Sequence, residues 1–126
     1  MTTVLDASAL LAFLHQEAGG ASVREYLADA VISCVNWSEV VQKSLVSGAD
    51  VRGMREDLTD LGLVVRPFSV WQAEMAGRLA PATSHLGLSL GDRACLALAL
   101  DLELPVLTAD RVWAKLSLGL EIRVIR

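Results

Sequence analysis

Two stretches of the sequence, TTVLDAS at residues 2–8 and PVLTADRV at residues 105–112, have the same form. In each, an apolar run rich in β-branched residues stops at an aspartate, Asp6 in the first stretch and Asp110 in the second. Short aliphatic runs bounded by helical patterns are typical of strands buried in a parallel sheet. Since ligands bind at the carboxyl edge of such a sheet, both aspartates are expected at the functional edge, and they can meet if their strands are neighbours.

The rest of the chain alternates between short aliphatic runs and helical patterns. The expected strands are Thr2–Leu5, Ala30–Val35, Leu63–Val65, Pro105–Thr108 and Ile122–Ile125. The expected helices are Ala7–His15, Ala21–Asp29, Asn36–Ser47, Asp50–Leu61, Ser69–Ala80, Asp92–Glu103 and Arg111–Leu116, with a loop over residues 82–91. This alternation predicts an α/β fold in which helices cover both faces of a parallel sheet. The length of 126 residues, without a repeat or a linker, predicts one domain over residues 1–126.

Composition and charge narrow the classes of function. The net charge of −4 is not that of a strongly basic nucleic-acid binder, so a nucleic acid would have to be held through metal ions and a local basic rim. No apolar run is long enough to cross a membrane, and no basic region precedes the first strand, so neither a membrane protein nor a signal peptide is expected. Cys34 and Cys95 lie within apolar runs, as buried free thiols of a cytoplasmic protein do.

Two further acids, Glu39 and Asp92, are expected at the starts of helices that follow strands, and therefore at the same edge. Each of the four acids also has an interpretation as a helix cap. Asp6 or Ser8 could cap the first helix and Asp110 the helix that follows it, while Asp92 is a candidate N-cap and Asn36 with Glu39 a candidate capping box. Capping does not explain why four acids would gather at one edge of the sheet, because two carboxylates about 4 Å apart repel by roughly 4 kcal/mol at an effective dielectric constant of 20. A helix dipole offsets only about 0.3–1 kcal/mol of this repulsion.

Either some of these acids are protonated or a cation lies among them, and a cluster made only of carboxylate oxygens favours Mg²⁺ or Mn²⁺ over zinc. A hard ion at the carboxyl edge of a parallel sheet suits phosphoryl chemistry, in which the ion activates water and neutralises charge. The sequence shows no Ser-His-Asp set, no P-loop and no GxGxxG pattern. A receiver domain would need an acidic pair at the end of the first strand, where Asp6 stands alone.

Four motifs together resemble the PIN-domain ribonucleases, of the VapC type that serve as toxins in bacterial toxin–antitoxin pairs. The motifs are VLDAS at 4–8, NWSE at 36–39, LSLGDRAC at 88–95 and LTADR at 107–111. The resemblance implies a three-layer α/β/α sandwich around a five-stranded parallel sheet in the order 3-2-1-4-5. It also implies endonucleolytic cleavage of RNA with Mg²⁺ or Mn²⁺, a homodimer, and inhibition by a cognate antitoxin. The catalytic and metal-binding residues that it implies are Asp6, Glu39, Asp92 and Asp110, with Ser8 and Thr108 supporting them.

Three further expectations concern binding. Arg93 and Arg111 each follow a site acid and are candidates to hold an RNA phosphate; the alternative is that both are ordinary surface arginines. The apolar residues of the first three helices predict a groove that leads toward Asp6 and receives an antitoxin segment. The competing interpretation of the whole chain is a non-catalytic module of the same fold that binds RNA or a protein partner.

Overall fold

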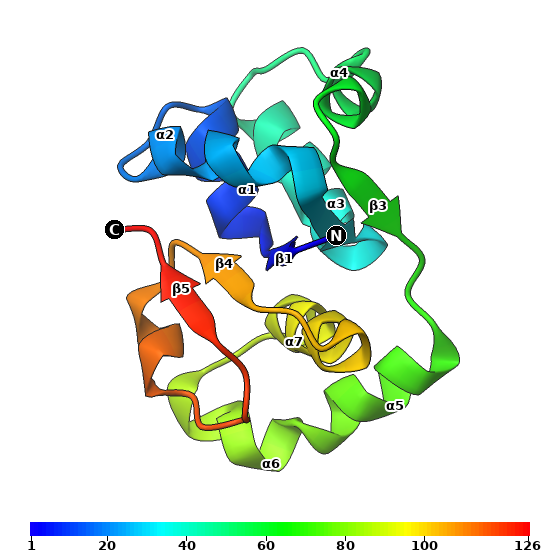
Figure 1. The fold of residues 1–126 in the computed structure, drawn as a ribbon, viewed down its shortest axis with the longest axis vertical. Coiled ribbons are helices and arrows are strands. Elements are labelled where there is room, and N and C mark those ends of the chain that lie inside the picture. Colours follow the sequence, from blue (N-terminus) through cyan, green and yellow to red (C-terminus); the bar gives the residue numbers. More distant parts are fainter.

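The computed structural model describes all 126 residues, Met1–Arg126, and contains five strands with helices between them (Figure 1). The strands are β1 (Thr3–Leu5), β2 (Ala30–Ser33), β3 (Val64–Arg66), β4 (Val106–Thr108) and β5 (Ile122–Val124). The α-helices are α1 (Ala7–Leu14), α2 (Gly20–Val23), α3 (Cys34–Val46), α4 (Met54–Asp60), α5 (Val70–Arg78), α6 (Ala80–Thr83) and α7 (Leu90–Leu102). The 3₁₀ helices are η1 (Arg24–Asp29), η2 (Ser84–Leu86) and η3 (Arg111–Lys115).

The five strands form one parallel sheet in the order β3-β2-β1-β4-β5, which confirms the expected topology. The central strand β1 pairs with β2 on one side and with β4 on the other. In this register Leu5 lies opposite both Ile32 and Leu107. The last residues of β1 and β4 are therefore neighbours, and the chain that leaves each strand emerges at the same edge of the sheet.

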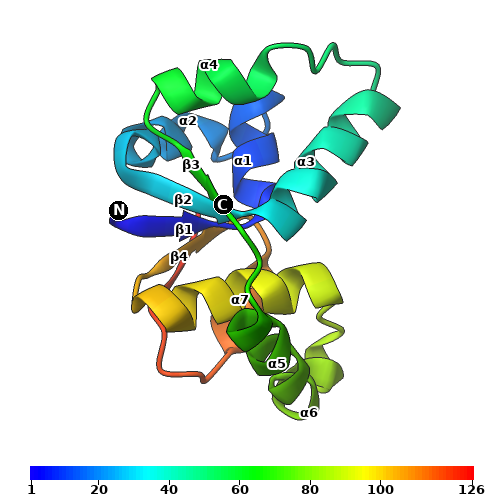
Figure 2. The ribbon, with the colours of Figure 1, turned by 90° about the vertical axis from the view of Figure 1, so that its right-hand side faces the viewer.

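Two hydrophobic cores lie on the two faces of the sheet. Side chains alternate along a strand, so Leu5, Ile32 and Leu107 pack into the core beneath α1 to α4. Val4, Val31 and Val106, one residue earlier on the same strands, pack into the core that contains α7 and the fully buried Trp113. Figure 2 shows the resulting three layers, with α1 to α4 above the sheet and α5 to α7 below it. The expected α/β/α sandwich is thus confirmed.

Several element boundaries differ from those expected, and local capping explains two of them. Helix α3 begins at Cys34 rather than Asn36, because the Ser33 side chain accepts a hydrogen bond from the Val35 amide and ends β2 early. Helix α7 begins at Leu90 rather than Asp92, because Ser89 is its N-cap. The expected interpretations of Asp92 as an N-cap and of Asn36 with Glu39 as a capping box are therefore wrong.

Other differences have backbone causes. Helix α4 begins at Met54 rather than Asp50, since Gly53 precedes it in the left-handed region with φ of 75°. The segment expected as one helix over residues 21–29 divides into α2 and the 3₁₀ helix η1. The expected loop over residues 82–91 contains the end of α6, the turn η2 and the start of α7. None of the helices combines the length and apolar character that crossing a membrane requires.

Candidate active site

Asp6 is the buried centre of the carboxyl edge, with only 4% of its surface exposed. It follows β1 directly and caps α1, accepting a hydrogen bond of 2.9 Å from the Ala9 amide. The Ser8 hydroxyl lies 2.8 and 2.9 Å from its two carboxylate oxygens, and the Thr108 hydroxyl donates to Oδ2 at 2.6 Å. Both carboxylate oxygens are thus held in place by donors from β1–α1 and from β4.

The environment of Asp6 makes its charge costly. The pKa of its carboxyl group is raised from 3.8 to about 6, mainly by burial and to a small extent by the negative charge of Asp92. Hydrogen bonds from Thr108, Ala9 and Ser8 act in the opposite direction but do not cancel the desolvation. At neutral pH the group is ionised in a place that penalises ionisation, as expected of a functional carboxylate rather than a structural one.

Asp110 lies beside Asp6 through a chain of hydroxyl groups. Its amide donates to the Thr108 hydroxyl at 3.0 Å, and the neighbouring Ala109 amide donates to the Ser8 hydroxyl at 2.9 Å. The Asp110 carboxylate itself accepts from the Val112 amide at 3.0 Å and caps η3. The two motifs that end in aspartate therefore meet in space, and Ser8 and Thr108 bridge them.

Glu39 approaches the same edge from α3, through a residue whose role the sequence did not reveal. The buried Asn36 side chain donates from Nδ2 to Glu39 Oε1 at 2.9 Å and to the Gly91 carbonyl oxygen at 2.9 Å. The only available signal was spacing, because residues three apart on a helix share a face. The contact with Gly91 spans 55 residues of sequence and has no local signature.

Asp92 completes the group and also caps its own helix. It forms a capping box with Ser89, whose amide donates to Asp92 Oδ2 at 2.9 Å. The convergence of the acids is seen at the fully buried Cys95, whose pKa is raised by burial and then by the charges of Asp6, Asp92 and Glu39. The charges of acids from three separate elements thus raise the pKa of one thiol, and Asp92 takes part in the capping box while lying near the other acids.

The donor chemistry of the four acids fits a hard divalent ion, since every side-chain ligand available at this edge is an oxygen. As the side chains lie in this structure, no group of three or more His, Cys, Asp or Glu residues is close enough to hold a metal ion. Asp6, Asp92 and Asp110 each accept a backbone amide instead. Joint ligation of one ion by these residues stays a prediction.

A basic rim borders the site. A hollow of about 430 Å³ is lined by Ser8, Ala109, Asp110, Arg111 and Arg126. The Arg111 guanidinium donates to the Arg126 carbonyl oxygen at 3.0 Å, so the two arginines lie side by side at this hollow. Arg111 lies at this edge, and its contact with an RNA phosphate stays a prediction. Arg126 was not predicted, although β5 runs parallel to β4 and its continuation must reach the same edge.

Arg93 has a different environment from Arg111. Its Nη1 donates at 2.8 Å to the Ala76 carbonyl oxygen of α5, and the residue is half-buried between α7 and α5. The guanidinium therefore ties two helices together on the lower layer. This geometry favours Arg111 over Arg93 as a phosphate contact.

The expected apolar groove between the first helices divides into two different hollows. The one that adjoins Ser8 is almost entirely polar, which is contrary to expectation, and is lined by Ser8, Leu11, His15, Glu17, Lys43, Ser47 and Arg126. The more apolar hollow lies between the ends of α1, α3 and α4, and its hydrophobic lining is Phe13, Leu14, Ala49, Met54, Leu58 and Leu61. The difference arises because Leu10 is fully buried in the core and Leu11, the one apolar residue at the polar hollow, keeps only 7% of its surface exposed.

A comparison with protein-family models finds one match, to the PIN domain, over residues 3–118. A comparison with curated protein sequences finds no match.

Solved structures share the fold at low sequence identity. A toxin–antitoxin complex from Klebsiella pneumoniae contains a chain 18% identical, with a TM-score of 0.77 and coverage of 99% of this chain and 98% of that one. DNA-bound VapBC from Salmonella typhimurium is 16% identical, with a TM-score of 0.73 and coverage of 100% and 99%. VapC20 of Mycobacterium tuberculosis, described as a sarcin–ricin loop cleaving toxin, is 10% identical, with a TM-score of 0.70 and coverage of 95% and 99%.

Proposed function

Since the chain belongs to the PIN domain family, we propose that it is a metal-dependent endoribonuclease and the toxin of a toxin–antitoxin pair. The observation that carries this proposal is that Thr108 ties the Asp6 carboxylate to the amide of Asp110, while Glu39 lies against Gly91, the residue before Asp92, at the carboxyl edge. The whole chain, residues 1–126, is proposed to act as one PIN domain. A solved structure of the same fold described as a sarcin–ricin loop cleaving toxin supports the activity.

The four acids are proposed to hold Mg²⁺ or Mn²⁺, with Asp6, Asp92 and Asp110 as direct ligands and Glu39 as a direct or water-mediated one. A bound divalent ion would supply a Lewis acid that activates water and offsets charge in the transition state of phosphodiester hydrolysis. Ser8 and Thr108 orient the Asp6 carboxylate through the hydrogen bonds described above. The burial of Asp6 excludes water from this carboxylate and so strengthens its attraction for a cation.

A non-catalytic binding module is the competing function. Such a module would gain nothing from a desolvated aspartate whose ionisation opposes folding, and asparagine at position 6 would serve a binding surface equally well. The burial of Asp6 therefore favours an enzyme.

The first prediction tests metal-dependent cleavage. Purified protein with Mn²⁺ or Mg²⁺ is expected to cut a mixture of structured and single-stranded RNAs, to lose this activity in EDTA, and to regain it when excess Mn²⁺ is added. End-labelled RNA on sequencing gels measures the cuts, and Asp29→Asn, a change at an exposed aspartate far from the edge, serves as the control. Cleavage that persists in EDTA would exclude the proposed mechanism, and tight binding without any cleavage would support the binding module.

The second prediction concerns the basic rim. In an Asp6→Asn background that prevents cleavage, Arg111→Glu is expected to weaken RNA binding and to reduce the slope of log K against log salt by about 1, because one phosphate contact is lost. Arg93→Glu tests whether Arg93 holds the phosphate instead of Arg111. Arg55→Glu, on the exposed helix α4, is the control for the change in net charge. Equal salt slopes in Arg111→Glu and Arg55→Glu would show that Arg111 is an ordinary surface arginine without a phosphate contact.

The partners are proposed to be RNA, a cognate antitoxin and a second copy of the chain, in the cytoplasm and without a membrane. The support is that solved structures of this fold include toxin–antitoxin complexes. Light scattering of the purified protein, alone and after co-expression with the protein encoded next to it, measures both assemblies. A monomer that never co-purifies with that product would contradict the proposal.

A further inference from the structure

We propose that Asn36 and Gly91 form a seat that positions the Glu39 carboxylate against the first turn of α7, an inference that rests on the proposed function. Asn36 acts from the same helix as Glu39, and Gly91 acts from the helix that carries Asp92. The seat sets how far Glu39 lies from Asp92, and so fixes two of the proposed metal ligands relative to each other.

The Asn36 amide provides one half of the seat. Its two N–H groups make two hydrogen bonds of 2.9 Å, one to Glu39 Oε1 and one to the Gly91 carbonyl oxygen. The first bond fixes the glutamate on its own helix, and the second ties that helix to α7. Only 1% of the Asn36 surface is exposed, so water does not compete for either bond.

Gly91 provides the other half by lacking a side chain. A Cβ atom on this residue would lie 2.6 Å from Glu39 Oε1 and 2.8 Å from both Cδ and Oε2, which is closer than real atoms approach. The position requires glycine for space, since no left-handed φ is found there. The obstructing atoms belong to the end of a flexible side chain, so alanine at this position would displace the Glu39 carboxylate and leave the backbone intact.

Stability alone does not explain this arrangement. The N-cap of α3 is Ser33, so Asn36 is not needed to start the helix. Its Oδ1 is buried without a hydrogen-bond partner, a cost that a small apolar residue would avoid. Holding Glu39 near Asp92 and Asp6 also brings like charges together. The unpaired oxygen and the close like charges oppose folding, and both are accounted for if the seat serves ligation.

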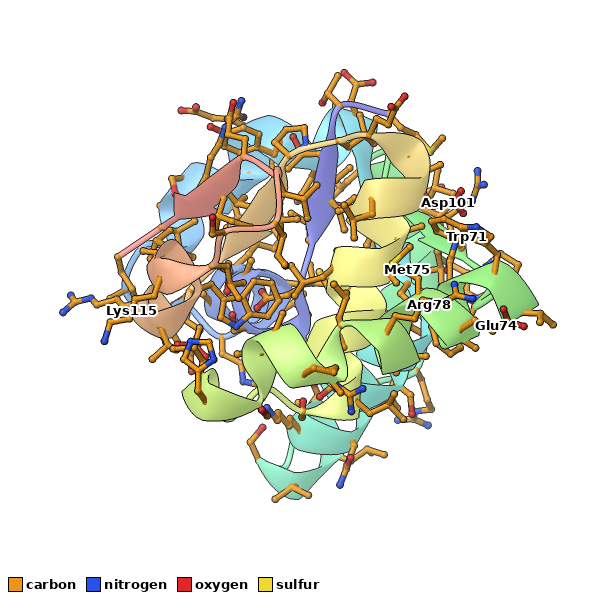
Figure 3. The ribbon with its side chains drawn as sticks, turned by 90° about the horizontal axis from the view of Figure 1, so that it is seen from below. Trp71, Glu74, Met75, Arg78, Asp101 and Lys115 are labelled. Carbon is orange, nitrogen blue, oxygen red and sulfur yellow. The ribbon has the colours of Figure 1, made fainter.

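The molecule offers a matched control for Asn36. Gln72 is also buried, also donates from its amide nitrogen to a carboxylate at 2.9 Å, and also leaves its amide oxygen without a partner. Its acceptor is Asp101, near the other end of α7. Figure 3 shows Asp101 beside Trp71 at the start of α5, on the flank of the lower layer. Loss of the Gln72 bond therefore removes one buried hydrogen bond between helices, as loss of the Asn36 bond to Gly91 does, without touching the four acids of the site.

The test measures Mn²⁺ binding by titration calorimetry on the whole protein, alongside thermal melting without metal and the kcat and KM of RNA cleavage. Asn36→Ala and Gly91→Ala are each expected to weaken Mn²⁺ binding about 10- to 100-fold, the usual effect of losing a residue that orients a metal ligand. Gln72→Ala is expected to lower the melting temperature as much as Asn36→Ala does while binding Mn²⁺ like the wild type. Gly77→Ala, at a helical glycine with open space around it, controls for the change in helix propensity in Gly91→Ala.

The outcomes separate the seat from the proposed function. Wild-type Mn²⁺ binding by both Asn36→Ala and Gly91→Ala, with loss of binding in Glu39→Gln, overturns the seat and leaves the proposed function standing. A wild-type protein that binds no Mn²⁺ overturns both. Should Asn36→Ala fail to fold, Gly91→Ala decides the matter, because the three atoms nearest to its added methyl group all belong to the Glu39 side chain.

Discussion

The Asp6→Asn variant is expected to cleave RNA at least about 100-fold more slowly than the wild-type protein, because a metal ligand contributes several kcal/mol to the transition state. Its fold is expected to persist. The asparagine Oδ1 still accepts the Ala9 amide and preserves the cap of α1, and the Thr108 hydroxyl can rotate toward Ser8. Single-turnover cleavage in excess Mn²⁺ measures the rate, and circular dichroism in EDTA measures the fold.

The control for this result is Asp29→Asn, which removes an exposed negative charge far from the edge and is expected to leave the rate unchanged. A small rate effect in Asp6→Asn accompanied by a large drop in melting temperature would show that Asp6 serves chiefly as a helix cap.

Asp92→Asn is expected to behave like Asp6→Asn. It keeps the capping box largely intact, because the new Oδ1 can accept the Ser89 amide.

Without metal, the free energy of unfolding of the wild-type protein is expected to fall as the pH rises from about 4 to above 6, relative to Asp6→Asn. The folded-state pKa of Asp6 is about 6, whereas an exposed aspartate has 3.8. Between these values the folded protein retains a proton that the unfolded chain has released, so raising the pH favours unfolding. The full difference corresponds to at most about 3 kcal/mol and is constant above that window.

Urea denaturation in EDTA at a series of pH values measures this effect, and subtracting the Asp6→Asn curve removes the contributions of all other groups. The variant is expected to be the more stable of the two at pH 7, as a strained functional site implies. A wild-type curve parallel to the variant curve from pH 4 to pH 7 would mean that Asp6 is not desolvated in solution. A wild-type protein that gains stability relative to the variant as the pH rises would mean that the carboxylate is stabilised in the fold.

The sheet could be predicted from the sequence because its signals are local. Each buried strand is a short aliphatic run, and each is followed by a helical pattern, so a parallel sheet with covered faces follows from the alternation. The edge at which Asp6 and Asp110 lie follows from the same reasoning, since parallel strands share a carboxyl edge. The strand order came from the family resemblance, and the observed sheet confirms it.

The sequence was less informative about helix starts, because several polar residues compete to cap each helix. Ser33 and Ser89 take the N-cap positions that the pattern had suggested for Asn36 and Asp92. Which polar residue becomes the N-cap depends on where the preceding segment places the backbone, and a few residues of sequence do not specify that position. The same limit placed the start of α4 four residues too early, before the left-handed Gly53.

The meeting of four acids at one edge of a parallel sheet could be predicted from the amino-acid pattern alone, because it requires only strand ends and helix starts. The contacts that hold them became visible in the folded chain: Ser8 bonds to residues about 100 positions away, and Asn36 to a glycine 55 positions away. It also decided that Arg93 ties two helices together while Arg111 meets Arg126 at the rim. These contacts depend on how whole layers pack, because the side chains that meet come from segments far apart in the chain. No local sequence pattern indicates which of these side chains will pair.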